Sequence, residues 1–335
     1  MYFVIGLGSM GRRRVRCLLA NKVAPEQIIG FDRREDRRIE AKQKHGIRTT
    51  DRVQDLAKDD IKAVFVSVWP NGHIPFCLMA AEARKHWFCE VPLALDLTDV
   101  DRLNTITQQN KLIGAVGSQM IFHPGSEQLK TWLDQDVTGG LVTGWGVCTS
   151  YFPAWHPWED YRQFYVSDKS AGGANIDMLG HELEWMCWLF GQKISAVNAK
   201  TSFRSNLELT PGSYDTADIL IEFTGGLTIN MHFDGVNRGS NRGLWLVGNE
   251  STIHWDLQGP KAYRFDLQNN ASIGAGPDEF EYEQAYVREI GHFITCVKTN
   301  DTTGWPVKID QAMNVIQFIS AVDQSAAQNG ERVVL

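Results

Sequence analysis

The chain begins with Tyr2-Phe3-Val4-Ile5 and continues at once into Gly6-Leu7-Gly8-Ser9-Met10-Gly11. Four consecutive apolar residues predict a short parallel strand that is buried on both faces, and the glycine motif follows where that strand ends. In this context the first glycine permits a tight turn, the second lets the backbone approach a pyrophosphate, and the third lets the next helix pack closely. The start of that helix offers unpaired N–H groups to the phosphates. We therefore assign to a dinucleotide site Gly6, Gly8, Ser9, Met10 and Gly11.

The next predicted strand, residues 27–31, ends in an acidic residue, Asp32. A carboxylate about twenty residues beyond the glycine motif accepts hydrogen bonds from the adenosine ribose and opposes a 2′-phosphate, which favours NAD. Arg33 and Arg34 follow directly and could stack on adenine or pair with that phosphate, so NADP stays possible. We assign Asp32 and Arg33 to the cofactor site and expect NAD as the cofactor.

Strands and helices alternate up to about residue 118. Strands are predicted over 61–68, 86–90 and 111–116, with helices over 74–84 and 97–109 between them. This alternation predicts a doubly wound parallel sheet of the Rossmann type over residues 1–118. Ligands of such sheets bind at the carboxyl ends of the strands. The residues at those ends and in the turns that follow them are Pro70, Asn71, His73, Glu90, Pro92 and Gln119.

The second half predicts a different kind of sheet. Residues 217–223, 227–233, 244–247 and 252–255 alternate or nearly alternate apolar and polar side chains, and glycine turns join neighbours. Antiparallel strands follow from this pattern, and helices over 283–297 and 309–329 close the chain. We expect a C-terminal α/β domain with a mostly antiparallel open sheet over residues 119–335, whose final helices could return to the first domain.

Composition excludes several classes of protein. With 335 residues and 43% hydrophobic residues the chain can bury two cores, and 33 basic against 40 acidic residues give a net charge of -7. That balance offers no general attraction to nucleic acid. The sequence contains no apolar stretch of about 18 residues, so we expect no membrane span and a cytoplasmic location. The six cysteines are scattered without metal-site spacing, so we expect reduced thiols and no metal.

Asp177 and His181 are the candidate catalytic residues. Four residues apart on a predicted helix, they project from one face, where the carboxylate can orient the imidazole. Such a histidine can take the hydroxyl proton of an alcohol while a hydride leaves the same carbon. From the spacing alone, a satisfied histidine in the core is the commoner explanation, because the surrounding helix is apolar.

Residues 151–165 are rich in tryptophan and tyrosine. Flat aromatic rings beside charged groups suit a carbohydrate, whose C–H faces are apolar, and Arg162 could pair with a sugar carboxylate. A lid or a dimer contact explains the same composition equally well. His123 could line the same pocket or serve a structural role at the domain hinge. The candidate substrate residues are Gln119, His123, Trp155, His156, Tyr161, Arg162 and Asn175.

Five motifs together resemble a known family. They are Gly6 to Arg13, Pro70 to His73, Cys89 to Leu93, Phe122 to Pro124, and Gly172 through Asp177 to His181. Over essentially its whole length the chain resembles the glucose-fructose oxidoreductase, inositol dehydrogenase and rhizopine catabolism family of NAD(P)-dependent oxidoreductases. The resemblance implies catalysis by Asp177 and His181 and hydride transfer between nicotinamide and a hydroxyl carbon of a sugar, amino sugar, polyol or sugar acid. It also implies a homodimer or homotetramer formed through the C-terminal sheet, and the aromatic stretch resembles a branch linked to surface-polysaccharide pathways.

One residue departs from the family pattern. The family usually has Glu-Lys-Pro where this chain has Glu90-Val91-Pro92, and the lysine lowers the cost of alkoxide character during hydride transfer. Losing such a group typically costs about 2 to 4 kcal/mol of transition-state stabilisation. Either His181 acts without it, or Arg162 or Lys169 replaces it, or the chain binds cofactor with little turnover in a sensing or assembly role. Redox-neutral use of retained NAD, as in an epimerase or glycosidase, is a further alternative.

Overall fold

The computed structural model describes residues 1–256, 259–266 and 271–335, without the side chains of residues 174, 175 and 271. Two units divide the chain. Residues 1–119 and 283–313 form the first, and residues 120–282 and 314–335 form the second.

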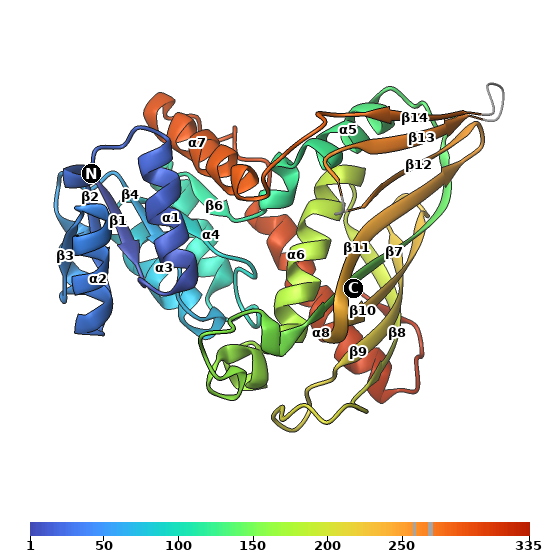
Figure 1. The fold of residues 1–335 in the computed structure, drawn as a ribbon, viewed down its shortest axis with the longest axis horizontal. Helices are drawn as coiled ribbons and strands as arrows, with labels where there is room; N and C mark the ends of the chain where they lie inside the picture. The colour runs from blue at the N-terminus through green and yellow to red at the C-terminus, as the bar shows by residue number, and fades with distance from the viewer. Residues whose placement is uncertain (257–258, 267–270) are drawn as a thin grey trace. The chain divides into compact units, whose positions relative to one another are not determined.

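Six short strands build the sheet of the first unit, as Figure 1 lets the reader follow. Its strands are β1 (Tyr2–Ile5), β2 (Ile28–Phe31), β3 (Arg48–Thr50), β4 (Ala63–Val66), β5 (His86–Cys89) and β6 (Gly114–Val116). They are all parallel, in the order β3-β2-β1-β4-β5-β6. Every residue of β1, β2 and β4 is buried, as expected for a parallel sheet covered on both faces. The predicted doubly wound parallel sheet is confirmed.

Five helices cover this sheet. They are α1 (Ser9–Ala20), α2 (Glu35–His45), α3 (His73–Glu82), α4 (Val100–Gln109) and α7 (Glu283–Thr299). Right-handed crossovers place α1 and α3 on opposite faces. Although α7 comes late in the sequence, it packs beside α1 (Figure 1). From α7 the ring of Phe293 meets Phe65 and Phe88 of the sheet edge-on, at 5.4 and 5.6 Å between ring centroids.

A buried ion cluster joins three of these elements. Arg14 of α1 is 1% exposed, and its guanidinium donates to both carboxylate oxygens of Glu90 at 2.7 and 2.5 Å. It also donates to Glu289 of α7 at 2.6 Å, while the other oxygen of Glu289 accepts the backbone N–H of Ser118. The Ser67 hydroxyl donates to Glu90. One guanidinium cation therefore binds two buried carboxylates. When both carboxylates are ionised, the cluster carries a net charge of −1.

The two carboxylates respond differently to this environment. Burial disfavours the charge of Glu90, but the positive charge of Arg14 together with the hydrogen bonds from Arg14 and Ser67 outweighs burial and lowers the pKa of Glu90. Burial raises the pKa of Glu289, and the nearby charge of Glu90 adds to that effect. Glu289 is thus the member of the cluster that protonates first as the pH falls.

The second unit is built on a nine-stranded sheet. Its strands are β7 (Leu141–Tyr151), β8 (Ile194–Ser202), β9 (Thr216–Phe223), β10 (Thr228–Asp234), β11 (Val236–Gly248), β12 (Ser251–Asp256), β13 (Ala262–Asp266), β14 (Ala271–Ala275) and β15 (Val333–Val334). The order is β14-β13-β12-β11-β7-β10-β9-β8-β15, and β7 and β10 are the one parallel pair described. The mostly antiparallel open sheet predicted for the second half is confirmed.

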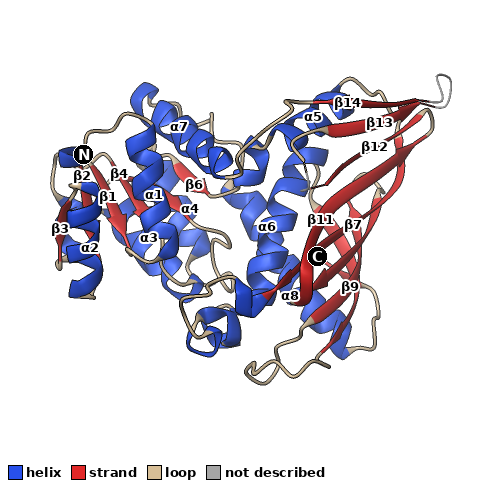
Figure 2. Ribbon diagram, viewed as in Figure 1, coloured by secondary structure: helices blue, strands red, loops and turns tan. Residues whose placement is uncertain are grey.

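One face of this sheet is covered and the other is open. The helices α5 (Pro124–Asp134) and α6 (Gly173–Phe190) and the second-unit part of α8 (Ile309–Ala327) lie on one side of it (Figure 2). Strands β9 and β10 alternate buried and solvent-facing residues, the pattern of a sheet with one wet face. We call the side without described helices the outer face.

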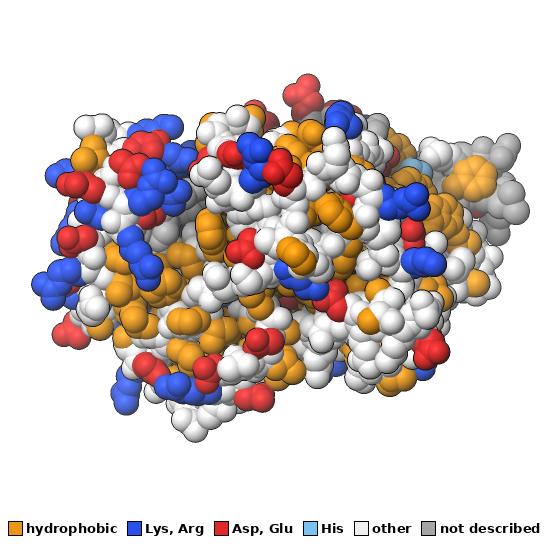
Figure 3. Space-filling model, turned by 90° about the horizontal axis from the view of Figure 1, so that it is seen from below, with side chains coloured by type: hydrophobic (Ala, Val, Ile, Leu, Met, Phe, Trp, Pro, Cys, Tyr) orange, Lys and Arg blue, Asp and Glu red, His pale blue; other side chains and the backbone are white. Residues whose placement is uncertain are grey.

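Charged side chains of both signs are interspersed on the surface of the first unit. Helix α2 carries acidic residues in its first turn and basic residues in its last, which complements the helix dipole. Figure 3 shows red and blue side chains mixed at its left end, with neither sign forming a broad patch on that face. Among the described helices, none has the length and apolarity that crossing a membrane requires.

The raised pKa of Glu289 predicts a pH-dependent stability. Because the folded chain holds this proton more tightly than the unfolded chain, stability falls as the pH rises from the ordinary glutamate value of 4.5 through the raised value. Glu289→Gln removes that titration. The free energy of unfolding of this variant, relative to that of wild type, should therefore rise as the pH increases from 4.5 through the raised pKa, by about 1.4 kcal/mol for each unit by which the pKa is raised.

Urea unfolding at each pH measures this difference. Glu283→Gln is the matched control, because Glu283 lies on the same helix but pairs at the surface with Arg13 and Arg16. Its difference from wild type should stay constant over the range. If the free energy of unfolding of Glu289→Gln relative to wild type fell as the pH rises, the raised pKa of Glu289 would be contradicted.

Candidate functional site

The turn after β1 requires glycine at two positions, Gly6 and Gly11. Gly6 has φ +87°, and a Cβ there would lie 2.4 Å from the carbonyl oxygen of Ser67. A Cβ at Gly11 would lie 1.7 Å from the Gly6 carbonyl oxygen, so only glycine lets α1 approach this closely. Gly8 caps α1 without a side-chain hydrogen bond, and the first turn holds no acidic residue. The N–H groups of Ser9 and Met10 thus begin a helix suited to the pyrophosphate of NAD.

The Asp32 carboxylate is fixed beside this turn. One oxygen accepts the backbone N–H of Leu7 at 2.8 Å, and the other accepts that of Arg34 at 2.9 Å. Its remaining lone pairs suit ribose hydroxyls. Arg33 is exposed, whereas Arg37 lies 3.5 Å from Asp32 Oδ2 and would stand 3.3 Å from a Cβ at Gly8. Sequence reasoning missed Arg37, because the helix that presents it, α2, has almost no apolar period.

The turns after β4 and β5 are tied together by a buried histidine. The Nδ1 atom of His73 lies 2.7 Å from the carbonyl oxygen of Pro92, and Nε2 lies 3.0 Å from that of Val68. The Val91-Pro92 peptide is cis, and Val91 is buried. Pro70 is buried and Asn71 is exposed. Of the predicted cofactor residues, His73 and Glu90 therefore make their described contacts inside the protein and shape the turns.

In the second unit, α6 carries both candidate catalytic residues. Asp177 Oδ1 lies 3.9 Å from His181 Nε2, which is close enough for electrostatic attraction but too long for a hydrogen bond. The side chains are 15% and 27% exposed, so solvent reaches the pair. Tyr165 donates a hydrogen bond of 2.9 Å to the same oxygen of Asp177. The pair predicted from a spacing of four residues thus lies on one helix face. Tyr165 ends the predicted aromatic stretch, but its contact with Asp177 was not predicted.

The next residue of α6 faces the sheet. Glu182 lies 2.5 Å from Arg242 Nη2, and the indole N–H of Trp185 donates to it at 3.0 Å. Arg242 lies on β11 opposite Cys148 of β7. Burial raises the pKa of the Cys148 thiol, and the Glu182 carboxylate adds to the effect. Sequence reasoning missed Arg242, although an arginine two residues before inward-facing Leu244 was a signal of a polar group under the helix.

The predicted aromatic stretch folds largely upon itself. Trp155 donates to Ser150 at 2.8 Å, and His156 lies 3.2 Å from Glu159 and stacks on Trp158. The Tyr161 hydroxyl accepts the backbone N–H of Glu208.

The two cations that could replace the family lysine are both paired. Arg162 contacts Asp160 and Glu208, and these carboxylates raise its pKa. Lys169 contacts Asp323 at 2.8 Å.

Three further predicted substrate residues lie outside residues 151–165 in the sequence. His123 is 3% exposed, caps α5 by accepting the Gly125 N–H, and lies 4.9 Å from Trp255 between ring centroids. Gln119 is buried in the turn after β6. The side chain of Asn175 lies outside the described residues. Within the described chain no group of three or more His, Cys, Asp or Glu side chains could hold a metal ion.

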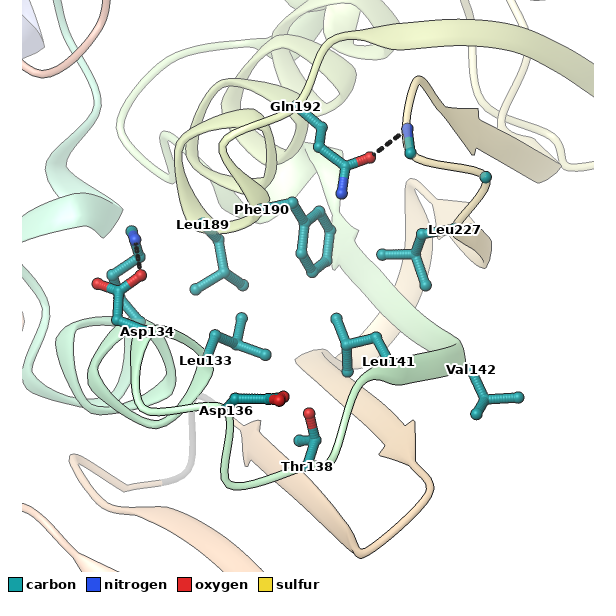
Figure 4. A pocket seen from close by; sticks show the side chains of 13 residues that line it. Leu133, Asp134, Asp136, Thr138, Leu141, Val142, Leu189, Phe190, Gln192 and Leu227 are labelled. Carbon is teal, nitrogen blue, oxygen red and sulfur yellow. Dashed lines mark hydrogen bonds and ion pairs between the residues drawn. The ribbon is translucent and has the colours of Figure 1, made fainter.

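A pocket of about 370 Å³ lies elsewhere in the second unit. It includes Leu189 and Phe190 at the C-terminal end of α6, together with Leu133, Leu141 and Leu227 (Figure 4). Asp177 and His181 belong to the first half of that helix. None of the predicted site residues lines the pocket, so it is separate from the candidate chemistry.

Comparisons with known proteins bear on both units. A family model described as an oxidoreductase family with an NAD-binding Rossmann fold matches residues 1–118, and the model of the GFO/IDH/MocA C-terminal domain matches residues 126–254. The myo-inositol 2-dehydrogenase of Thermotoga maritima is 31% identical over 230 residues, which cover 67% of this chain and 65% of that protein. The chain thus spans slightly less than two thirds of the length of this relative. The scyllo-inositol 2-dehydrogenase (NAD(+)) of Bacillus subtilis is 24% identical over 99% of this chain and 95% of that protein.

Solved structures share the fold. Levoglucosan dehydrogenase in complex with NADH and levoglucosan superposes with a TM-score of 0.86 at 18% identity, covering 99% of this chain and 98% of that one. A probable dehydrogenase from Thermotoga maritima gives 0.81 at 24% identity over the same shares. The resemblance that the motifs indicated is confirmed: the chain belongs to the glucose-fructose oxidoreductase, inositol dehydrogenase and rhizopine catabolism (Gfo/Idh/MocA) family of NAD-binding oxidoreductases.

Proposed function

We propose that this chain is an NAD-dependent dehydrogenase or reductase that acts on a CH–OH group of a neutral polyol or sugar. The observation that carries the proposal is the Asp177 and His181 pair on α6, in a chain whose other unit holds the glycine turn and Asp32. Relatives named as inositol 2-dehydrogenases support a polyol. A neutral substrate is favoured over a sugar acid because Arg162, Lys169 and Arg242 each already pair with a carboxylate.

His181 is the proposed acid and base. In the oxidation direction its imidazole nitrogen takes the proton of the substrate hydroxyl as the carbon loses a hydride, which leaves a ketone. NAD, when bound, accepts that hydride with its two electrons. Asp177 orients the imidazole and stabilises its protonated form by attraction across 3.9 Å. In the reduction direction His181 returns the proton to the oxygen.

A second candidate function follows from Val91. Val91 is 3% exposed and carries no charge, and the cations named as replacements for the family lysine are paired elsewhere. A protein that binds NAD with little turnover and acts in sensing or assembly has the same geometry in the first unit. A role in surface-polysaccharide metabolism and a cytoplasmic location stay predictions from the sequence.

We also propose that the outer face of the second-unit sheet binds a second copy of the chain. Trp145, Trp245, His254 and Tyr263 lie in register across four strands, and their rings stack at 6.0, 6.0 and 5.3 Å between centroids. Trp145 is 45% exposed. Exposed aromatic rows on flat sheets are typical of interfaces between proteins, and two copies of one sheet present matching surfaces.

The first test is NADH binding followed by turnover of a polyol and sugar panel that includes myo-inositol. His181→Asn should lower kcat by at least about 100-fold while the dissociation constant for NADH stays within about twofold, because the imidazole moves a proton and does not hold the cofactor. His45→Asn, a substitution at the end of α2, is the control and should leave both quantities unchanged. Binding of NADH without turnover of any substrate would favour the non-catalytic function instead.

Asp32 should set the preference between NADH and NADPH. Asp32→Asn removes the charge that opposes a 2′-phosphate and weakens the acceptor for the ribose, so the ratio of the NADPH to the NADH dissociation constant should fall about tenfold. Titration of nicotinamide fluorescence measures both constants. Asp36→Asn removes an equal charge from an exposed residue that pairs with Arg34, and should leave the ratio unchanged. If Asp32→Asn weakened the binding of NADH and NADPH equally, Asp32 would only hold the turn and would not select the cofactor.

Trp145→Glu should convert the oligomer into monomers. A carboxylate in the centre of the aromatic row would be buried without a partner in the assembly, which costs several kcal/mol. Light scattering after size-exclusion chromatography gives the mass. Phe203→Glu is the matched control, because Phe203 is 46% exposed and lies beyond the end of β8. A wild-type mass equal to one chain would refute the proposal.

A further inference from the structure

The hydroxyl of Tyr165 contacts the carboxylate that faces the proposed base. It donates to Asp177 Oδ1 at 2.9 Å, and this same oxygen lies 3.9 Å from His181 Nε2. Tyr165 begins a short turn, Tyr165–Ser167, that packs against α6. One carboxylate oxygen therefore lies between a phenol donor and the imidazole, and all three groups belong to the second unit.

The turn that presents the phenol is braced on several sides. The Ser167 hydroxyl donates to the carbonyl oxygens of Arg162 and Phe164, at 3.0 and 3.1 Å. The Phe164 ring lies 4.4 Å from the Tyr165 ring and 4.3 Å from the His156 ring between centroids. These contacts restrict the backbone and the ring of Tyr165. The hydroxyl is thus held in place before any substrate binds.

Such a donor has a specific use in this chain. A hydrogen-bond donor on one carboxylate oxygen restricts rotation of the Asp177 side chain. The 3.9 Å between Asp177 Oδ1 and His181 Nε2 is too long for a hydrogen bond between these two atoms, whereas the Tyr165 hydroxyl supplies one to the same oxygen. A residue that orients the partner of a reacting group affects the reaction indirectly. Removing such a residue commonly lowers activity by about 10 to 100-fold. The positive groups on the same stretch, Arg162 and Lys169, are committed to other carboxylates.

We propose that Tyr165 is a positioning residue of the acid and base pair, because its hydroxyl fixes Asp177 with Oδ1 toward His181. The catalytic consequence rests on the proposed function, whereas the positioning itself does not. Tyr165→Phe removes one oxygen atom and keeps the ring that packs against Phe164. It should lower kcat by about 10 to 100-fold and leave KM and the dissociation constant for NADH within about twofold.

A double-mutant cycle separates positioning from a general structural role. If the phenol acts through Asp177, then Tyr165→Phe has little further effect in the Asp177→Asn background. Tyr214→Phe is the matched control, since it removes the hydroxyl of a buried tyrosine in the segment between β8 and β9 of the same unit. It should leave kcat unchanged. Additive effects of Tyr165→Phe and Asp177→Asn, or an unchanged kcat in Tyr165→Phe, would overturn the proposal.

A spectroscopic measurement tests the positioning without turnover. The imidazole ¹⁵N resonances of His181, assigned by comparison with His181→Asn, should move in Tyr165→Phe and stay in place in Tyr214→Phe. Unmoved resonances in Tyr165→Phe would overturn the proposal even for an active enzyme. If wild type turns over no polyol or sugar, the proposed function fails, and these resonances alone decide whether Tyr165 positions the pair.

Discussion

The buried guanidinium of Arg14 is the constraint on which the rest of the first unit depends. A charge that is 1% exposed is tolerable only when several acceptors surround it, and Glu90 and Glu289 supply them from opposite ends of the sequence. The same cluster fixes the helix that begins at the glycine turn, the turn after β5 and the backbone at Ser118. Loss of either carboxylate would leave the cation short of partners, so the cofactor turn and the returning helix α7 are energetically linked.

The second unit holds its charges in a different way. Its proposed chemistry requires a partly exposed imidazole, and His181 has it, while the carboxylate beside it is anchored by a neutral phenol. Arg242 of the sheet is neutralised by Glu182, which follows His181 on the same helix. The positive charge of Arg242 is therefore bound to a carboxylate. Members of the family usually have a lysine where this chain has Val91. Turnover without that lysine would make the orientation of Asp177 more important than in a site with a preorganised cation.

Sequence reasoning predicted the local fold where a residue type has one use in one local context. The glycines after β1 and the acid after β2 belong to such a context, because the steric limits of a tight turn and the position of a strand end leave few alternatives. It missed helix α2, whose single buried residue is Ala41, because a helix without an apolar face has no period to detect. Arg37 was missed with it. Tyr165 was passed over because its partner lies twelve residues away and is reached only when the intervening turns have formed.

The sequence by itself determined the parallel and antiparallel sheets, the cofactor turn and the spacing that puts Asp177 and His181 on one helix face, since each follows from local sterics and hydrophobic period. Only the tertiary structure decided how charges are shared. It showed Glu90 bonded to Arg14 and Arg162 bonded to Asp160 and Glu208, where the residue types alone would equally allow contacts with a ligand. The physical reason is that an ion pair depends on the distance between side chains that folding brings together. For Arg14 with Glu90 and Arg162 with Glu208, which lie 76 and 46 residues apart in the sequence, position along the chain does not encode that distance.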